Sequence, residues 1–256
     1  MQRTLMNQSR FDIDIGYRGV FSAVFIMAAW VLSLGFFATR SLGTEAILWI
    51  PFAVWLRTFL NVGLFISAHD AMHGTLYPKS EKVNHGLGAL AVALYAGFSY
   101  GHLLREHHRH HNLSGTLADP DFADSYDHGF FRWFFAFMIR YCSLAQFASL
   151  NLMVLGFFLL GVSPAQMLLF WALPSILSAV QLFYFGTYRP HRIEDEAFED
   201  EHRARSSRAG NLYSFLTCYH FGYHLEHHRY PWVPWWALPR VREEARPGSL
   251  SKIPAA

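Results

Sequence analysis

The sequence predicts an all-helical integral membrane protein, and three observations lead to this fold class. Of the 256 residues, 52% are hydrophobic and 17% aromatic whereas only 16% are charged, which is too apolar a balance for an ordinary soluble domain. Four apolar segments approach the roughly 20 residues that a helix needs to cross a bilayer. Tight turns join these segments in pairs, so we expect four transmembrane helices in two hairpins, in a single membrane domain over residues 1–256.

The predicted spans cover residues 20–39, 46–68, 144–160 and 165–187, and the third is the shortest and weakest. Gly161-Val-Ser-Pro164 forms the turn between the last two spans, and Ser41-Leu-Gly-Thr44 forms the turn between the first two. The first nineteen residues are polar, and no small-residue cleavage site follows the apolar stretch after them. The first span is therefore expected to be an uncleaved anchor.

Two shorter apolar or aromatic pieces, residues 86–100 and 130–141, are too short or too charged to span, so we expect re-entrant or interfacial helices. Retained positive charge marks cytoplasmic loops. With the N-terminus inside, all but two of the 21 Lys and Arg residues lie inside, since Arg40 lies outside and Arg57 within a span. Residues 69–143 and 188–256 then form a cytoplasmic cap, and both termini lie on the cytoplasmic face.

Charge and cysteine content exclude several other classes of protein. A net charge of +2 is too small to indicate a nucleic-acid partner. The two cysteines, Cys142 and Cys218, have no paired spacing, so neither a disulfide framework nor a zinc knuckle is indicated. The sequence has no Gly-x-Gly-x-x-Gly fingerprint, which argues against a nicotinamide or flavin site within this chain.

This topology puts all fifteen histidines on one side of the membrane, and most of them fall into three boxes. The boxes are His69-x-x-x-His73, His107-x-x-His110-His111 and His224-x-x-His227-His228, and His191 stands alone just past the fourth span. Residues three or four apart share a helix face, so the two histidines of the first box can point at one centre, as can those of the third. Two adjacent histidines, as in the second box, diverge by about 100° around a helix, which suits two metal ions side by side.

A single histidine at a membrane interface is more simply explained as an amphipathic surface residue than as a ligand. That explanation fails for the set, because eight unliganded neighbours would repel one another whenever they were protonated. Imidazole binds iron, copper, zinc and nickel alike, but a zinc site is complete with about four ligands. Eight or nine donors can fill two metal ions and leave positions for a small oxidant, so the sequence predicts a dinuclear site.

Several polar residues near the boxes could support the ligands. Asp70, Asp119 and Asp121 could accept hydrogen bonds from ligand N–H groups, or could serve in turns and caps, as Asp beside Pro commonly does. Asn61 lies two helical steps of four before His69, so it could line a cavity beneath the metals or bond to a neighbouring helix.

The boxes resemble those of the membrane di-iron oxygenases and fatty acid desaturases. Three stretches around them are similar to bacterial-type β-carotene ketolases within that superfamily: GLFISAHDAMHGTLYP, REHHRHHNLSGTLADPDF and LTCYHFGYHLEHHRYPWVPWWALPRVR. The resemblance runs from about residue 60 to residue 242.

The resemblance implies a fatty acid desaturase-like four-span bundle in the bacterial inner membrane, with two non-haem iron ions, O2 as co-substrate, and electrons from an external ferredoxin-type donor. It implies that carbon 4 of a carotenoid β-ionone ring is hydroxylated twice and then loses water. The products would be echinenone and canthaxanthin from β-carotene, or astaxanthin if zeaxanthin is accepted. The implied iron ligands are His69, His73, His107, His110, His111, His224, His227 and His228, with His191 as the ninth and His220 as its alternative.

Other functions compete with this prediction. A carotenoid β-ring hydroxylase and a fatty acid or lipid desaturase would use the same metal site. A metal transporter or a haem-binding membrane protein is the alternative outside this class of enzymes. Transporters place ionisable ligands near mid-membrane, whereas these histidines cluster at span ends. A substrate that stays in lipid would explain this position, and a long apolar tunnel is then expected.

Overall fold

The computed structural model describes residues 11, 13–122, 129–194 and 197–245, and every regular element in this part of the chain is helical. In chain order the elements are α2 (Arg18–Ala38), the 3-10 helix η1 (Thr44–Leu48), α3 (Ile50–Met72), α4 (Glu81–Ala96), α5 (Tyr100–Leu113), α6 (Phe130–Tyr141), α7 (Leu144–Leu159), α8 (Pro164–Met167), the π-helical η2 (Leu168–Ala172), α9 (Leu173–Phe183), the π-helical η3 (Tyr184–Tyr188), α10 (Arg189–His191), α11 (Asn211–Cys218), α12 (His224–Arg229), the 3-10 helix η4 (Trp235–Ala237) and α13 (Leu238–Ala245).

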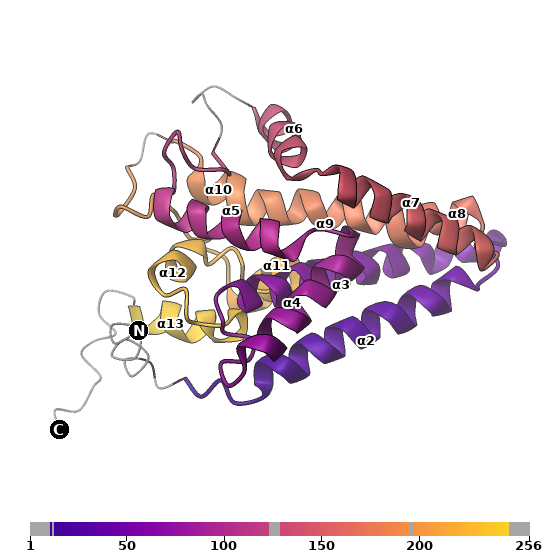
Figure 1. The fold of residues 1–256 in the computed structure, drawn as a ribbon, viewed down its shortest axis with the longest axis horizontal. Coiled ribbons are helices and arrows are strands. Elements are labelled where there is room, and N and C mark those ends of the chain that lie inside the picture. Colours follow the sequence, from indigo (N-terminus) through magenta and orange to yellow (C-terminus); the bar gives the residue numbers. More distant parts are fainter. Residues whose placement is uncertain (1–10, 12, 123–128, 195–196, 246–256) are drawn as a thin grey trace.

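Three helices are long and apolar enough to cross a membrane. They are α2, the helix Ala46–Met72 that includes α3, and the helix Pro164–His191 that runs from α8 through α10. One end of each lies near the small helices α11, α12 and α13, which belong to the predicted cap and lie on the left of Figure 1. The predicted all-helical membrane fold is confirmed, and three of the four predicted spans are present as such helices.

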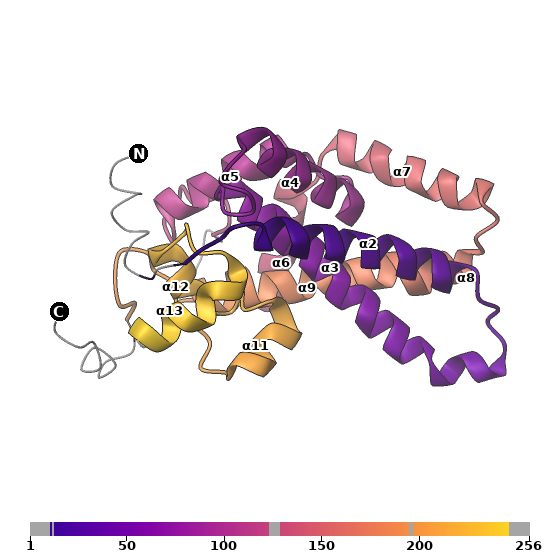
Figure 2. The same cartoon turned by 90° about the horizontal axis from the view of Figure 1, so that it is seen from below.

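The remaining predicted span, residues 144–160, corresponds to α7. Its 16 residues are about 24 Å long, which is less than the roughly 30 Å thickness of the hydrocarbon core. A bend of 90° separates α7 from α6, and the two helices together are apolar enough to form one broken span or a re-entrant loop. Figure 2 shows α7 set apart from the long helices. The four-span topology therefore stays a proposal.

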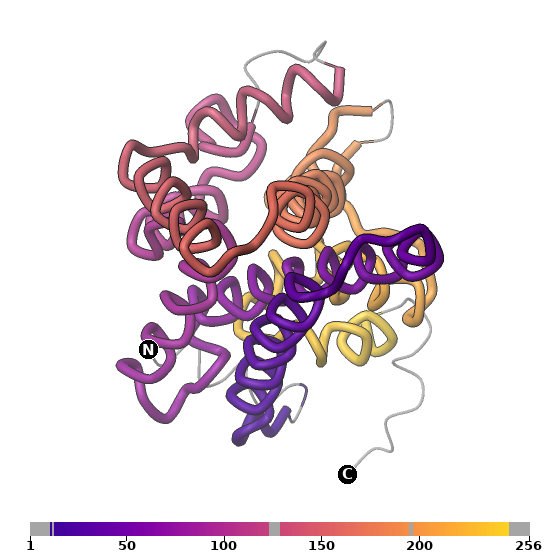
Figure 3. Tube along the Cα trace, turned by 90° about the vertical axis from the view of Figure 1, so that its right-hand side faces the viewer, coloured from indigo at the N-terminus to yellow at the C-terminus, as the bar shows by residue number. Residues whose placement is uncertain are grey.

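The helix expected at residues 86–100 begins and ends earlier in the structure, because local caps override the apolar run. The side chain of Ser80 accepts a hydrogen bond from the Val83 amide at the start of α4. Gly97 ends α4 in the left-handed conformation at a φ of 68°. α5 then starts at Tyr100 with a bend of 102°. The helix expected at residues 130–141 matches α6. In Figure 3, α6 and α7 lie in the upper part of the view and α2, one of the three long helices, lies in the lower part.

A buried arginine joins the long helices. Arg57, which is fully buried in α3, donates hydrogen bonds to the backbone carbonyl of Trp30 in α2 and to that of Phe170 in η2. In an α-helix the N–H of residue 174 would bond to the Phe170 carbonyl, but Pro174 has no N–H. The guanidinium supplies the missing donor and fixes three helices relative to one another.

A close contact seats the segment before α12 against the third long helix. A Cβ at Gly186 would lie 2.0 Å from the ring of Phe221, so only glycine allows this approach. Phe221 in turn packs against His69, with ring centroids 4.9 Å apart, and against His224, at 5.2 Å. This packing brings a histidine of the cap beside a histidine at the end of α3.

Candidate metal centre

Nine histidines from four elements converge where the long helices meet the cap. Their ring nitrogens form two groups, and within each group the potential ligand atoms lie within 4.8 Å of one another. Group one contains His69, His73, His107, His111 and His227, and group two contains His110, His191, His224 and His228. The end of α3 supplies two of these residues, α5 three, α10 one and α12 three.

The three boxes do not map simply onto the two groups. His110 and His111 belong to different groups, as their divergence around the helix leads one to expect. The expectation that the third box grips a single centre is wrong, because His227 joins group one whereas His224 and His228 join group two. The reason is the same divergence of about 100° between adjacent residues of α12.

The spacing between the ring nitrogens suits a shared cation. In group one the Nε2 atoms of His73 and His107 are 2.7 Å apart. In group two the Nε2 atom of His224 lies 3.0 Å from that of His191 and 3.0 Å from that of His228. Metal–nitrogen bonds of about 2.0–2.1 Å place two donors on one ion no more than about 4.2 Å apart. These contacts fall within that range.

The hydrogen bonds on the outer ring nitrogens direct lone pairs inward. His110 donates through Nδ1 to Asp119 at 2.9 Å, and His191 donates through Nδ1 to the backbone carbonyl of Arg203 at 2.8 Å. A neutral imidazole protonated at Nδ1 carries only a lone pair at Nε2. The buried Nε2 of His69 has no hydrogen-bond partner among the described residues. The donor set therefore fits metal ions.

Electrostatics keeps the histidines of α12 available as ligands. Burial, together with repulsion from neighbouring histidines, lowers the pKa of His227 and of His228 well below the usual value. Neutral imidazole is the form that binds a metal. Burial opposes ionisation of Asp119, but the hydrogen bond from His110 and two backbone N–H groups hold the pKa of Asp119 below its usual value. An ionised carboxylate thus faces the outer nitrogen of His110.

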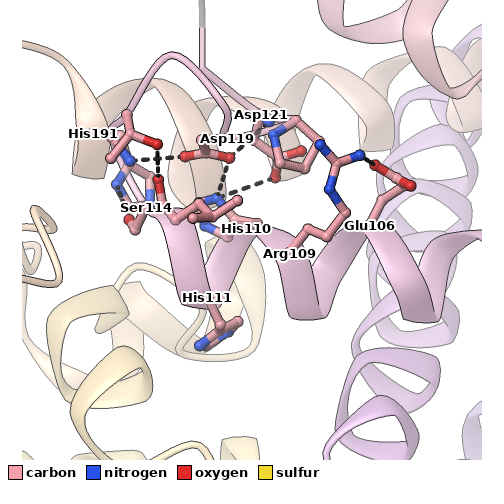
Figure 4. A network of polar contacts seen from close by, with 12 residues as sticks. Glu106, Arg109, His110, His111, Ser114, Asp119, Asp121 and His191 are labelled. Carbon is pink, nitrogen blue, oxygen red and sulfur yellow. Dashed lines mark hydrogen bonds and ion pairs between the residues drawn. The ribbon is translucent and has the colours of Figure 1, made fainter.

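The network around His110 is drawn in Figure 4. Asp119 also accepts hydrogen bonds from the Gly115 and Asp121 amides, at 2.8 and 2.9 Å. Asp121 places its Oδ2 atom 3.8 Å from Nδ1 of His110 and accepts a hydrogen bond from the hydroxyl of Tyr141. Both carboxylates of the "ADPDF" stretch therefore lie beside a proposed ligand.

The other predicted supporting residues make hydrogen bonds with different partners, although Oδ1 of Asp70 lies 4.0 Å from Nδ1 of His69. Asp70 accepts a hydrogen bond from the Trp235 amide at 3.2 Å and so ties the cap to α3. Asn61 accepts one from the indole N–H of Trp30 at 2.7 Å, and thus links α3 to α2. His220, the alternative ninth ligand, belongs to neither group of the described residues and packs against the rings of Phe215 and Trp235.

Two residues near the site were not predicted from the sequence. The hydroxyl of Ser114 lies 3.3 Å from Nδ1 of His191, beside the Arg203 carbonyl. The position of Ser114, four residues after His110, was a usable signal, because such residues share a helix face. A backbone carbonyl carries no sequence signal, so the contact of Arg203 could not be foreseen.

An apolar cavity of about 420 Å³ ends against the histidines. His69, His107, His110 and His224 form part of its wall. The cavity extends along the third long helix from Thr187 back to Trp171, with α6 and α7 on its other side. Two of its lining residues are exposed on the protein surface, Phe147 of α7 at 68% and Ile176 of α9 at 58%. The cavity therefore opens between α7 and α9, at an apolar surface.

Comparisons with known proteins agree with these features. The fatty acid desaturase family model matches residues 46–152 and 140–253. A β-carotene ketolase of a Paracoccus strain is 45% identical over 220 residues, which cover 85% of this chain and 89% of that protein. The β-carotene ketolase of a second Paracoccus strain is 44% identical over 187 residues, which cover 73% of this chain and 76% of that protein.

A zeaxanthin 4-ketolase of Chlamydomonas reinhardtii is 42% identical over 235 residues, which cover 91% of this chain and 51% of that longer protein. No solved structure matches the chain. The matched regions contain all nine converging histidines. The chain therefore belongs to the fatty acid desaturase family and groups within it with the β-carotene ketolases.

Proposed function

We propose that this protein is a carotenoid ketolase, which introduces a keto group at carbon 4 of β-ionone rings with two iron ions, O2 and electrons from a ferredoxin-type donor. Identities of 42–47% to proteins named β-carotene or zeaxanthin ketolases support the activity. The observation that carries the proposal is the pair of histidine groups that closes one end of an apolar cavity.

Group one would hold one iron and group two the other. When bound, the irons supply the activation of O2 and the oxidising power that breaking an unactivated C–H bond requires. The protein's own residues set the position and basicity of the ligands. Asp119 orients His110, and the Arg203 carbonyl with Ser114 orients His191.

The cavity would bind the substrate and exclude water from the reacting ring. Its wall is mostly apolar, so a β-ring and the adjoining polyene can leave the lipid without losing hydrogen bonds. The opening between α7 and α9 allows the rest of a long carotenoid to stay in the bilayer. The histidines close the end of the cavity that would hold the β-ring. The same CH2 group can therefore be presented for two successive hydroxylations. The resulting geminal diol loses water to give the ketone.

We also propose a location and an orientation. The three long apolar helices make the protein a membrane protein. The distribution of Lys and Arg supports a cytoplasmic position for both termini and for the histidine groups, in the inner membrane of a bacterium. An external carrier could then deliver electrons from the cytoplasm.

Expression in a host that makes β-carotene tests this proposal. The wild-type protein is expected to yield 4-keto carotenoids and to contain two irons per chain. His227→Ala should yield no 4-keto carotenoid, because group one loses a ligand. His108→Ala is the matched control, since His108 lies in the second box but donates its Nε2 proton to the Met72 carbonyl.

Other outcomes would replace the proposal. Hydroxylated carotenoids alone would indicate a β-ring hydroxylase, and altered acyl chains with unchanged β-carotene would indicate a desaturase. Haem absorbance or a single zinc ion would exclude the di-iron oxygenase.

A further inference from the structure

The cavity carries a pair of polar groups at its metal end. Tyr141 and Asp121 both line it, beside the wall formed by Leu103, Phe137 and Met138. The Tyr141 hydroxyl donates to Oδ1 of Asp121, and Oδ2 of Asp121 lies 3.8 Å from Nδ1 of His110. Tyr141 is only 7% exposed. The pair is thus tied directly to group two and removed from bulk water.

An unsubstituted β-ring gives these groups nothing to bind. The phenolic oxygen of Tyr141, which donates its proton to Asp121, keeps acceptor capacity, and so does the carboxylate. Beside a purely apolar ligand this remaining acceptor capacity stays unused, which is unfavourable for polar groups at a buried site. A substrate hydroxyl would supply the missing donor.

The position of Tyr141 and Asp121 determines which ring carbon must carry such a hydroxyl. The carbon to be oxidised has to face the histidine groups, and Asp121 is in contact with one of those histidines. A hydroxyl on the neighbouring ring carbon places its oxygen two bonds away from the reacting carbon. It can therefore reach Tyr141 or Asp121 while the reacting carbon keeps its place.

The remaining tyrosine of the cavity wall is already occupied elsewhere. The hydroxyl of Tyr95 accepts a hydrogen bond from Ser178 at 3.1 Å, and Ser175 donates to the Trp171 carbonyl at 2.7 Å. The first contact joins α4 to the third long helix and the second lies within that helix, so both serve the helical scaffold. Tyr95 thus provides a matched comparison for Tyr141.

We propose that Tyr141 and Asp121 form a hydroxyl-binding subsite, which makes a β-ring with a 3-hydroxyl group a better substrate than an unsubstituted ring. The proposal rests on the proposed ketolase function and specifies its substrate class. The 3-hydroxyl donates a hydrogen bond to this pair and helps to hold the adjacent CH2 group against the histidine groups.

A competition experiment tests the subsite. The full-length protein in lipid vesicles receives equal amounts of β-carotene and zeaxanthin with an electron donor, and the 4-keto products of each are quantified. The ratio of the two kcat/KM values should favour zeaxanthin for the wild type. Tyr141→Phe should lower that ratio on the order of tenfold, because one hydrogen bond in a buried site is lost. Tyr95→Phe should leave the ratio at the wild-type value.

A second substrate keeps the test independent of how well the variant folds. The 3,3′-dimethyl ether of zeaxanthin cannot donate a hydrogen bond, so the wild type should lose its preference for it. Equal turnover of the ether and the alcohol, or an unchanged ratio in Tyr141→Phe, would overturn the subsite. If the wild type forms no ketone from either carotenoid, the proposed function fails as well, and that result is distinct from a ketolase without preference.

Discussion

Among single residues, Asp119 should have the most selective effect on the metal centre. Its carboxylate accepts the Nδ1 proton of His110, which belongs to group two alone. Replacement by Asn removes the negative charge that fixes the tautomer and strengthens the donor, and such changes typically weaken metal binding by about 10–100-fold. We therefore expect Asp119→Asn to fall from two irons per chain towards one, measured by metal analysis after dialysis against a weak chelator.

Glu106→Gln is the matched control for this prediction. Glu106 lies on the same helix, α5, but pairs with the exposed Arg109 at 2.8 Å instead of with a histidine. Its carboxamide variant should keep both irons. Two irons in Asp119→Asn, or an equal loss in both variants, would show that the carboxylate does not support group two.

At this scale the sequence predicts the participants better than their arrangement. The three- and four-residue spacings, together with the family resemblance, pick out nine histidines that the structure brings together. The spacing within α12 could not reveal that His227 belongs to the same group as the α3 histidines, because this depends on how α12 is rotated against α5. His191 and His220 were both plausible, and only the fold places His191 beside His224.

Among the elements, the buried Arg57 determines how the long helices are held together. Arg57→Met leaves the carbonyl of Phe170 and that of Trp30 without their donors, which should cost roughly 2–4 kcal/mol of unfolding free energy. Arg57→Lys should retain only part of the stability, because an ammonium cannot reproduce the planar guanidinium. Thermal unfolding in detergent measures both. Arg40→Met, at the exposed end of α2, should unfold like the wild type, and equal midpoints for all variants would contradict this role.

Sequence patterns predict some features of the helices and not others. Apolar length located α2, α3 and the third long helix, and aromatic content located α6. The π-helical segments η2 and η3 were not foreseen. Each is followed closely by a proline, Pro174 or Pro190, but a proline predicts a disturbed helix without saying whether the chain will bend or widen. The bends at Gly97 and Ser143 likewise depend on helix caps, which a count of apolar residues does not detect.

For the whole molecule, the position of the cavity links the membrane to the metal centre. The third long helix runs beside the cavity over most of its length and ends at His191, so a substrate lying along that helix points at group two. α7 makes its main contacts with α4, and the cavity opens between α7 and α9. The sequence predicts an apolar tunnel, but it does not indicate the helices between which the tunnel opens. This arrangement lets a rigid polyene enter sideways from lipid.

Filling the far part of the cavity tests whether the substrate occupies it. Ala172 lines the cavity next to Trp171, well before the histidine end of the same helix. Ala172→Trp should occupy the space of the polyene and reduce ketone formation at least about tenfold, because overpacking a shaped site excludes a rigid ligand. Both irons should remain bound, since no histidine is displaced. The exposed Ala165, near the start of this long helix, provides the control Ala165→Trp, which should retain wild-type ketone formation. Full ketone formation by Ala172→Trp would mean that the polyene follows another route to the histidines, and loss of iron would mean that the substitution acts through the fold.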